Sequence, residues 1–145
     1  MKIVVILPTY NERVNILKLI PLLHDEIFPQ ITNHIMELLV VDDNSPDGTA
    51  EEVKKFMEKW KNIHLLEGKK KGLGVAYVRG MHYAMDEMQA DAVMEFDADF
   101  QHDPNDIPRL VKALDEGADA VIGSRYIPGG AIPKDWGIHR KLISR

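Results

Sequence analysis

The sequence predicts a three-layer α/β/α fold, in which an open, mostly parallel sheet lies between two layers of helices. Five short apolar runs rich in β-branched residues alternate with four segments of helical periodicity, as in repeated βα units with right-handed crossovers. The first run is apolar almost without interruption, as expected of a strand covered on both faces. Polar residues gather where the runs end, the side of such a sheet at which ligands bind.

Length and composition limit the classes of protein that fit. A chain of 145 residues is the size of one ordinary domain. It contains no cysteine, which excludes a disulfide framework, a thiolate metal site and a cysteine nucleophile. Its apolar runs are far too short to cross a bilayer, and Met1 and Lys2 lead directly into a strand. We therefore expect neither a membrane span nor a signal peptide in these residues.

The net charge of −5 is unevenly distributed. Residues 125–145 carry a net charge of +4, so residues 1–124 carry −9. An acidic body argues against a nucleic-acid-binding protein, whose basic face would dominate its surface. The basic end of the chain is either a solvated tail or a local site for an anion.

The first two predicted strands both end in polar residues. The first covers residues 2–8 and ends at Pro8, because proline cannot donate to a ladder. No glycine fingerprint follows it, so a nicotinamide enzyme is not expected. The next helix should be kinked by Pro21. The second strand covers residues 35–41 and is followed by an acidic pair, Asp42 and Asp43, which should lie beside the end of the first strand.

The middle of the chain predicts two amphipathic helices around a short strand at residues 63–66. Asp47 or Thr49 can cap the first helix. The loop at residues 67–74 is rich in lysine and glycine, but it lacks the spacing of a phosphate-binding P-loop, so a mobile, solvated loop is the favoured interpretation. We expect the regularly spaced apolar residues of both helices to be core: Val53, Phe56, Met57, Trp60, Tyr77, Met81, Ala84 and Met88.

The fourth predicted strand begins near Val93 and ends in three oxygen-bearing side chains. Asp97, Asp99 and Gln101 alternate, so an extended backbone would point all three the same way. Carboxylate and amide oxygens suit Mg²⁺ or Mn²⁺, which usually share such ligands with substrate phosphates. The alternative is that the aspartates merely cap the helix that follows Pro104.

The last predicted elements are a helix and a strand. The helix carries apolar residues from Ile107 to Leu114 and should end at Gly117. The strand covers residues 118–123. Beyond it the chain is rich in turn residues, and a further helix could begin at Trp136.

Four segments resemble one known family. They are VVILPTYNE at residues 4–12, VVDDNSPDGT at 40–49, DADFQH at 97–102 and GSRY at 123–126. Together they closely resemble family 2 glycosyltransferases of the GT-A fold, and most closely those that act on dolichyl or polyprenyl phosphate. The resemblance implies metal-dependent transfer of mannose, with inversion, from GDP-mannose to the lipid phosphate at the cytoplasmic surface of a membrane. It also implies a nucleotide-sugar-binding domain at residues 1–126 and a basic acceptor-side segment at 127–145, where a longer domain would continue.

The resemblance also implies roles for individual residues. The nucleotide of the donor would be held by Pro8, Tyr10, Glu12, Val41, Asp43, Asp97 and Ala98. The divalent ion, Mg²⁺ or Mn²⁺, would be ligated by Asp99 and Gln101, with Asp97 close to it. The phosphates would be gathered by Arg125, Arg140, Lys141 and Ser144. The residues closest to the chemistry would then be Asp99, Arg125 and Arg140.

The implied chemistry needs no strong general base. The second pKa of a lipid monophosphate is about 6, so the acceptor is largely dianionic at neutral pH. The acceptor phosphate does require cationic partners. Arginine can donate two parallel hydrogen bonds to a phosphate, whereas lysine offers only a point charge.

Two alternatives stay open: the same fold acting with UDP-glucose or another donor or acceptor, and a nucleotide-binding module without catalysis. A phosphoacceptor receiver domain does not fit, because no acidic pair follows the first strand and no lysine ends the last.

Overall fold

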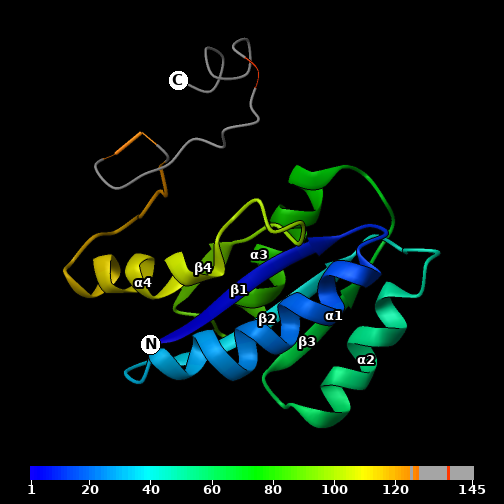
Figure 1. Cartoon of the computed structure of the whole chain (residues 1–145), viewed down its shortest axis with the longest axis horizontal. Helices are drawn as coiled ribbons and strands as arrows, with labels where there is room; N and C mark the ends of the chain where they lie inside the picture. Colours follow the sequence, from blue (N-terminus) through cyan, green and yellow to red (C-terminus); the bar gives the residue numbers. More distant parts are fainter. Residues whose placement is uncertain (125, 128–136, 138–145) are drawn as a thin grey trace. The chain divides into compact units, whose positions relative to one another are not determined.

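The computed structural model describes residues 1–124, 126, 127 and 137. The chain divides into two units, Met1–Pro108 and Arg109–Arg145. The first contains a sheet of four parallel strands in the order β3-β2-β1-β4 (Figure 1). The strands are β1 (Lys2–Thr9), β2 (Ile35–Asp42), β3 (Ile63–Glu67) and β4 (Ala92–Glu95).

Helices cover both faces of the sheet, which confirms the predicted three-layer architecture. Helices α1 (Arg13–Leu22) and α2 (Thr49–Lys59) pack together on one face, and α3 (Leu73–Asp86) lies on the other (Figure 1). Helix α1 runs through Pro21 and continues as a π-helical turn at Leu23–Ile27 and a 3₁₀ turn at Phe28–Gln30. Within the described residues, no helix is both long and apolar enough to cross a membrane.

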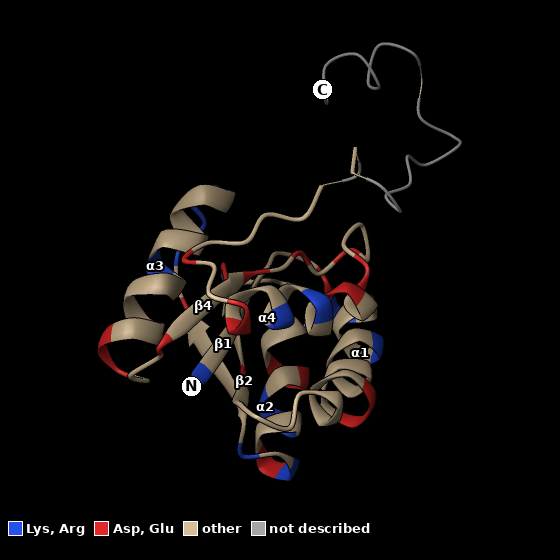
Figure 2. Cartoon of the chain, turned by 90° about the vertical axis from the view of Figure 1, so that its left-hand side faces the viewer, with Lys and Arg blue, Asp and Glu red and all other residues tan. Residues whose placement is uncertain are grey.

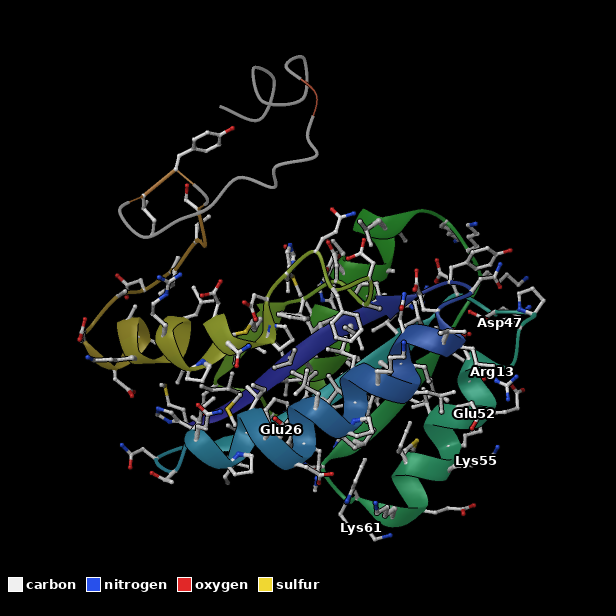
Figure 3. The ribbon with its side chains drawn as sticks, viewed as in Figure 1. Arg13, Glu26, Asp47, Glu52, Lys55 and Lys61 are labelled. Carbon is white, nitrogen blue, oxygen red and sulfur yellow. The ribbon has the colours of Figure 1, made fainter. Side chains whose placement is uncertain are left out.

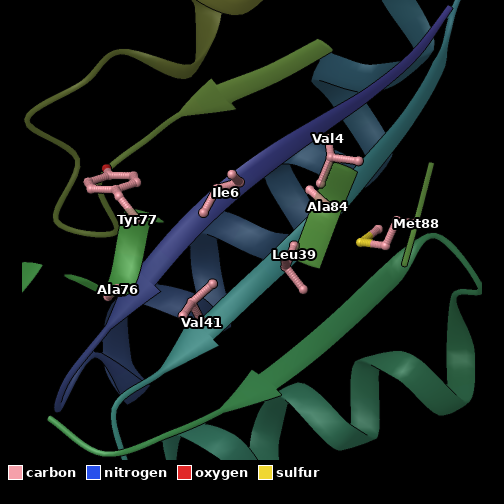
Figure 4. Packing of buried hydrophobic residues seen from close by; sticks show 8 residues of the cluster. All are labelled: Val4, Ile6, Leu39, Val41, Ala76, Tyr77, Ala84 and Met88. Carbon is pink, nitrogen blue, oxygen red and sulfur yellow. The ribbon is translucent and has the colours of Figure 1, made fainter. Parts of the chain in front are cut away.

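The alternation of side chains along the buried strands explains why both faces are covered. Residues 3–7 of β1 are fully buried, and successive side chains of a strand point to opposite faces. Val4 and Ile6 pack with Leu39 and Val41 of β2 beneath α3 (Figure 4). Helix α3 contributes Ala76, Tyr77 and Ala84, followed by Met88, to the same cluster.

Strand order places the candidate site. The chain moves outward from β1 through β2 to β3, and then returns to form β4 on the other side of β1. The switch in direction therefore lies between β1 and β4, and ligands of open α/β sheets bind outside the carboxyl ends of strands at such a point. Several acidic residues lie on the loops between the strands and helices of this unit (Figure 2).

Gly80 allows α3 to lie close to the sheet. A Cβ atom at this position would lie 2.7 Å from Ile6 Cγ2 and 2.9 Å from Val41 Cγ2. We expect Gly80→Val to lower the free energy of unfolding by roughly 1–3 kcal/mol, because the core has no room for the side chain. Gly74→Val is the matched control, since it lies in the same helix with nothing within 4 Å of its Cβ position. Urea unfolding of both variants checks this, and equal stability would contradict it.

The prediction of a fifth strand was wrong. Residues 118–123 carry no strand in the structure, and Ile122 is 89% exposed. They follow Gly117, which has a φ of +98° just after helix α4 (Ile107–Asp115) and stops this helix as predicted. A short apolar run becomes a strand only where a neighbouring ladder accepts it, and the sequence pattern does not reveal that partner. The helix predicted from Trp136 lies outside the described residues, apart from Gly137.

Candidate functional site

Asp42 connects the carboxyl ends of β1 and β2 through hydrogen bonds of its side chain. Its side chain is fully buried and faces Thr9, its register partner on β1. The carboxylate accepts hydrogen bonds from Thr9 Oγ1 at 2.9 Å, Ser45 N at 2.8 Å and Ser45 Oγ at 2.6 Å. Its oxygens are therefore committed to the fold, which leaves Asp43 as the member of the acidic pair that can serve a ligand.

Asp43 is held by an arginine of α3. Arg79 donates from one terminal nitrogen to Asp43 Oδ1 at 2.7 Å, and the side chains are 25% and 7% exposed, respectively. Gly68, after β3, makes room for this pair, because a Cβ there would lie 2.5–2.9 Å from the guanidinium atoms of Arg79. The Nε atom of Arg79 is buried without a hydrogen-bond partner in the described residues. The sequence pattern did not single out this arginine as a partner of Asp43.

The loop that carries Tyr10 and Glu12 is fixed by the loop after β2. The backbone N–H groups of Asn11, Glu12 and Arg13 donate to Ser45 Oγ, Thr49 Oγ1 and Asp47 Oδ2, respectively, at 3.0–3.2 Å. The Arg13 side chain also pairs with Glu52 at 2.7 Å, and Lys55 with Glu52 at 3.0 Å (Figure 3). The hydrogen bonds from Arg13 and Lys55 lower the pKa of Glu52.

The N-cap position of α2 is Gly48, not the predicted Asp47 or Thr49, but Asp47 still accepts from the first helical N–H group of α2. Thr49 N and Thr49 Oγ1 donate to its Oδ1 at 3.0 and 2.6 Å. Burial opposes ionisation of the carboxylate, but these bonds and the one from Arg13 N outweigh that effect and lower the pKa of Asp47.

The lowered pKa of Asp47 gives stability a defined dependence on pH. Because the folded-state pKa lies below the ordinary value of 3.8, the stabilisation is fully present above that pH and is lost as pH falls through the folded value. We expect Asp47→Asn to cost about 1 kcal/mol at neutral pH, because an amide has one acceptor oxygen and cannot accept from both Thr49 and Arg13 N. The variant should also flatten the decline of stability below pH 3.8. Thermal unfolding between pH 2 and 7 measures both effects. Asp86→Asn, at a side chain 71% exposed and 3.9 Å from its nearest charged partner, is the control, and an unchanged acid profile for Asp47→Asn would contradict the assignment.

Asp97 follows β4 and contacts two side chains. Tyr77 of α3 donates its hydroxyl to Asp97 Oδ1 at 2.7 Å. Burial and the Asp97 carboxylate raise the pKa of Tyr77 far above its ordinary value, so the phenol stays protonated and acts as the donor. His102 Nδ1 accepts from Asp97 N at 3.2 Å, while His102 Nε2 lies 3.6 Å from Asp97 Oδ2. The neutral ring therefore carries its proton on Nε2, the nitrogen that faces the carboxylate.

The segment after Asp97 turns instead of running straight. Asp99 Oδ1 accepts from Gln101 N at 2.9 Å, and Phe100 between them has a φ of +62°. The expectation of an extended backbone with three side chains on one side was therefore wrong. Asp99 is exposed, and its Oδ2 has no hydrogen-bond partner among the described residues. Among all the residues that the structure describes, no group of three or more histidine or acidic residues could hold a metal ion by itself.

A pocket of about 500 Å³ adjoins Asp97. Helix α3, the end of β4 and the segment after it line the pocket with Leu73, Gly74, Tyr77, Val78, Met81, Glu95, Asp97 and His102. Another pocket, of about 510 Å³, lies near the amino ends of β1 and β2 and has none of the predicted site residues in its lining. Of these two pockets, only the one beside Asp97 therefore contains a residue that the sequence predicted for the site.

The lysine-rich loop contacts the candidate nucleotide site. Lys70 Nζ lies 3.3 Å from the centroid of the Tyr10 ring, a cation–π contact. The loop that was interpreted as mobile and solvated thus meets the segment after β1.

The remaining predicted residues fall into two groups. Pro8 and Val41 are register partners at the buried ends of β1 and β2, and Ala98 is buried beside Asp97. Outside the described residues lie Arg125, Arg140, Lys141 and Ser144. The structure therefore places Pro8 beside Val41 and connects both Asp43 and Asp97 to α3.

Comparison with known proteins decides the family. The model for glycosyl transferase family 2 matches residues 4–144. The chain belongs to glycosyl transferase family 2. Solved structures agree: the mannosyltransferase PcManGT from Pyrobaculum calidifontis, in complex with GDP-Man and Mn²⁺, matches this chain with a TM-score of 0.61 and 27% identity over 83% of this chain and 33% of that one. TarS 1–349 of S. aureus matches with a TM-score of 0.53 and 25% identity over 87% and 40% of the two chains. The fold is of the GT-A type.

Curated relatives of this family 2 chain include enzymes of lipid-linked mannose synthesis. It is 40% identical to the dolichol-phosphate mannosyltransferase of Pyrococcus furiosus, over the whole chain and 39% of the relative. It is 39% identical to the polyprenol monophosphomannose synthase of Mycolicibacterium smegmatis, over 97% of the chain and 51% of the relative. The dolichol-phosphate mannosyltransferase of Saccharomyces cerevisiae is 36% identical over the same shares. The chain therefore spans about half, or less, of the length of these relatives.

Proposed function

We propose that this chain carries the donor-binding part of a glycosyltransferase that moves mannose from GDP-mannose to dolichyl or polyprenyl phosphate, with inversion. The observation that supports this most is that two side chains of α3 donate hydrogen bonds to carboxylates that follow two different strands. Arg79 contacts Asp43 after β2, and Tyr77, two residues earlier, contacts Asp97 after β4. The names of the relatives and the GDP-Man complex of PcManGT favour mannose and GDP.

The residues after β4 fit a divalent ion, Mg²⁺ or Mn²⁺. Asp99 offers a carboxylate oxygen with no partner in the described residues. Asp97 lies two residues away, with one oxygen facing Tyr77 and the other facing His102. One or two carboxylates are the usual protein share of a site that Mg²⁺ completes with substrate phosphates and water. An ion bound there would neutralise negative charge on the departing diphosphate. Asp97, Asp99 and Gln101 remain our candidates for holding it.

The donor nucleotide would lie along the carboxyl ends of β1 and β2. Pro8, Tyr10, Glu12, Val41, Asp43 and Ala98 stay our candidates for its base and ribose. Asp43 suits this role because Arg79 takes only Oδ1, which leaves Oδ2 without a partner among the described residues. A carboxylate oxygen held in this way can accept hydrogen bonds from sugar hydroxyls or base N–H groups.

The acceptor side is assigned to the basic end of the chain. Arg125, Arg140 and Lys141 carry the positive charge that a lipid phosphate and a diphosphate require. We assign residues 1–126 to donor binding and 127–145 to the acceptor side. Because the acceptor would be a lipid, we place the reaction at a membrane surface, and the family resemblance favours its cytoplasmic side.

Titration calorimetry with GDP and with UDP, each with and without Mn²⁺, tests the donor assignment. We expect GDP to bind more tightly than UDP and to depend on Mn²⁺. Tighter binding of UDP would instead favour the UDP-glucose alternative. Transfer of labelled mannose from GDP-mannose to a short polyprenyl phosphate then separates an enzyme from a binding module, which would bind the nucleotide and form no product.

A further inference from the structure

Tyr77 combines a buried ring with a polar tip at the end of the sheet. The residue is 8% exposed, and its ring belongs to the core cluster beneath α3, together with Val4 and Ile6 (Figure 4). Its hydroxyl leaves this cluster at the carboxyl end of β4 and donates to Asp97 Oδ1 at 2.7 Å. The tyrosine therefore links a rigid helix to a residue of an irregular segment.

Asp97 needs such a link, because regular structure does not hold it. Strand β4 ends at Glu95, and the chain from Phe96 to Asp103 forms turns and bends. A side chain on such a segment keeps one orientation only where neighbouring groups fix it. The exposed His102 ring, 3.6 Å from Oδ2, is a weaker constraint than the buried phenol at 2.7 Å from Oδ1.

We propose that Tyr77 is a positioning residue, whose hydroxyl fixes the Asp97 carboxylate in the orientation that serves the divalent ion and the nucleoside diphosphate. This inference rests on the proposed function. Tyr77 acts through Asp97, because its hydroxyl proton is donated to that carboxylate. Removal of such an outer partner typically weakens metal binding by 10–100-fold.

The test replaces Tyr77 with phenylalanine, which keeps the ring in the core and removes only the hydroxyl. Binding of Mn²⁺ in the presence of saturating GDP is measured by calorimetry and by the electron paramagnetic resonance signal of free Mn²⁺. We expect affinity for Mn²⁺ to fall about 10–100-fold in Tyr77→Phe. Tyr83→Phe is the matched control, because Tyr83 lies in the same helix, partly buried, with no hydroxyl partner among the described residues; its Mn²⁺ affinity should be that of the unmodified chain.

A double variant separates positioning from general damage to the fold. If Tyr77 acts through Asp97, adding Tyr77→Phe to Asp97→Asn should change Mn²⁺ affinity less than twofold, because the carboxylate it positions is already gone. Equal and independent losses in the two backgrounds would overturn the proposal. Mn²⁺ affinity in Tyr77→Phe equal to that of the unmodified chain, with Asp97→Asn impaired, would also overturn it and would leave the proposed function standing. Absence of Mn²⁺-dependent GDP binding in the unmodified chain would overturn both.

Discussion

Replacement of Asp99 by alanine is expected to reduce mannose transfer by about 10²–10³-fold, the usual loss when one electrostatic contributor to a transition state is removed. Asp99 is exposed, and its only hydrogen bond from the described residues comes from Gln101 N. Its loss should therefore leave the melting temperature nearly unchanged. Transfer of labelled mannose to a short polyprenyl phosphate at saturating Mg²⁺, together with thermal unfolding, measures both effects.

Asp103→Ala is the matched control for Asp99. Asp103 is also exposed, and its Oδ1 accepts from the backbone N–H group two residues later, at 3.0 Å from Asn105 N. Asp103 Oδ1 also accepts from Asn105 Nδ2 at 2.9 Å, so Asp103→Ala removes at least as much local hydrogen bonding as Asp99→Ala. Only Asp99 has a predicted role in the reaction. Transfer by Asp99→Ala at the rate of Asp103→Ala would defeat the assignment of Asp99.

Replacement of Asp42 by alanine is expected to lower the free energy of unfolding by about 3 kcal/mol. Three donors would lose their acceptor at a fully buried position, and each buried group left unsatisfied costs roughly 1–3 kcal/mol. The loops after β1 and β2 would also lose their connection. Urea unfolding monitored by circular dichroism measures the change.

Asp86→Ala provides the comparison for Asp42. The Asp86 side chain is 71% exposed and lies 3.9 Å from His82, so its removal should change stability by about 0.5 kcal/mol or less. If Asp42→Ala unfolds at the same urea concentration as Asp86→Ala, the buried carboxylate does not hold the strand ends together.

The sequence was sufficient to predict the layers and the edge of the sheet that carries the site. Strands β1 and β2 agree with their predictions to within one residue, because long buried strands have an unambiguous apolar pattern. Residues 118–123 show the same kind of pattern without forming a strand. The composition of a segment indicates whether it prefers to be buried. Whether it pairs with a neighbouring strand depends on the tertiary structure.

The roles of individual site residues were harder to predict. Asp42 and Asp43 are chemically identical neighbours, but successive residues of a strand point in opposite directions, so one meets Thr9 and the other meets Arg79. Tyr77 was correctly predicted as a core residue from its helical spacing. Its hydroxyl partner could not be predicted, because Asp97 lies 20 residues away in the sequence. A tyrosine on an otherwise apolar face was the available signal, since a buried hydroxyl usually finds a partner.

The most direct test of the metal–nucleotide site is a crystal structure of the chain with GDP and Mn²⁺. We expect the anomalous signal of Mn²⁺ at Asp99, next to Asp97 and the diphosphate of GDP, with the nucleoside along Asp43. An ion or a nucleotide bound away from the carboxyl ends of β1, β2 and β4 would contradict the proposed function.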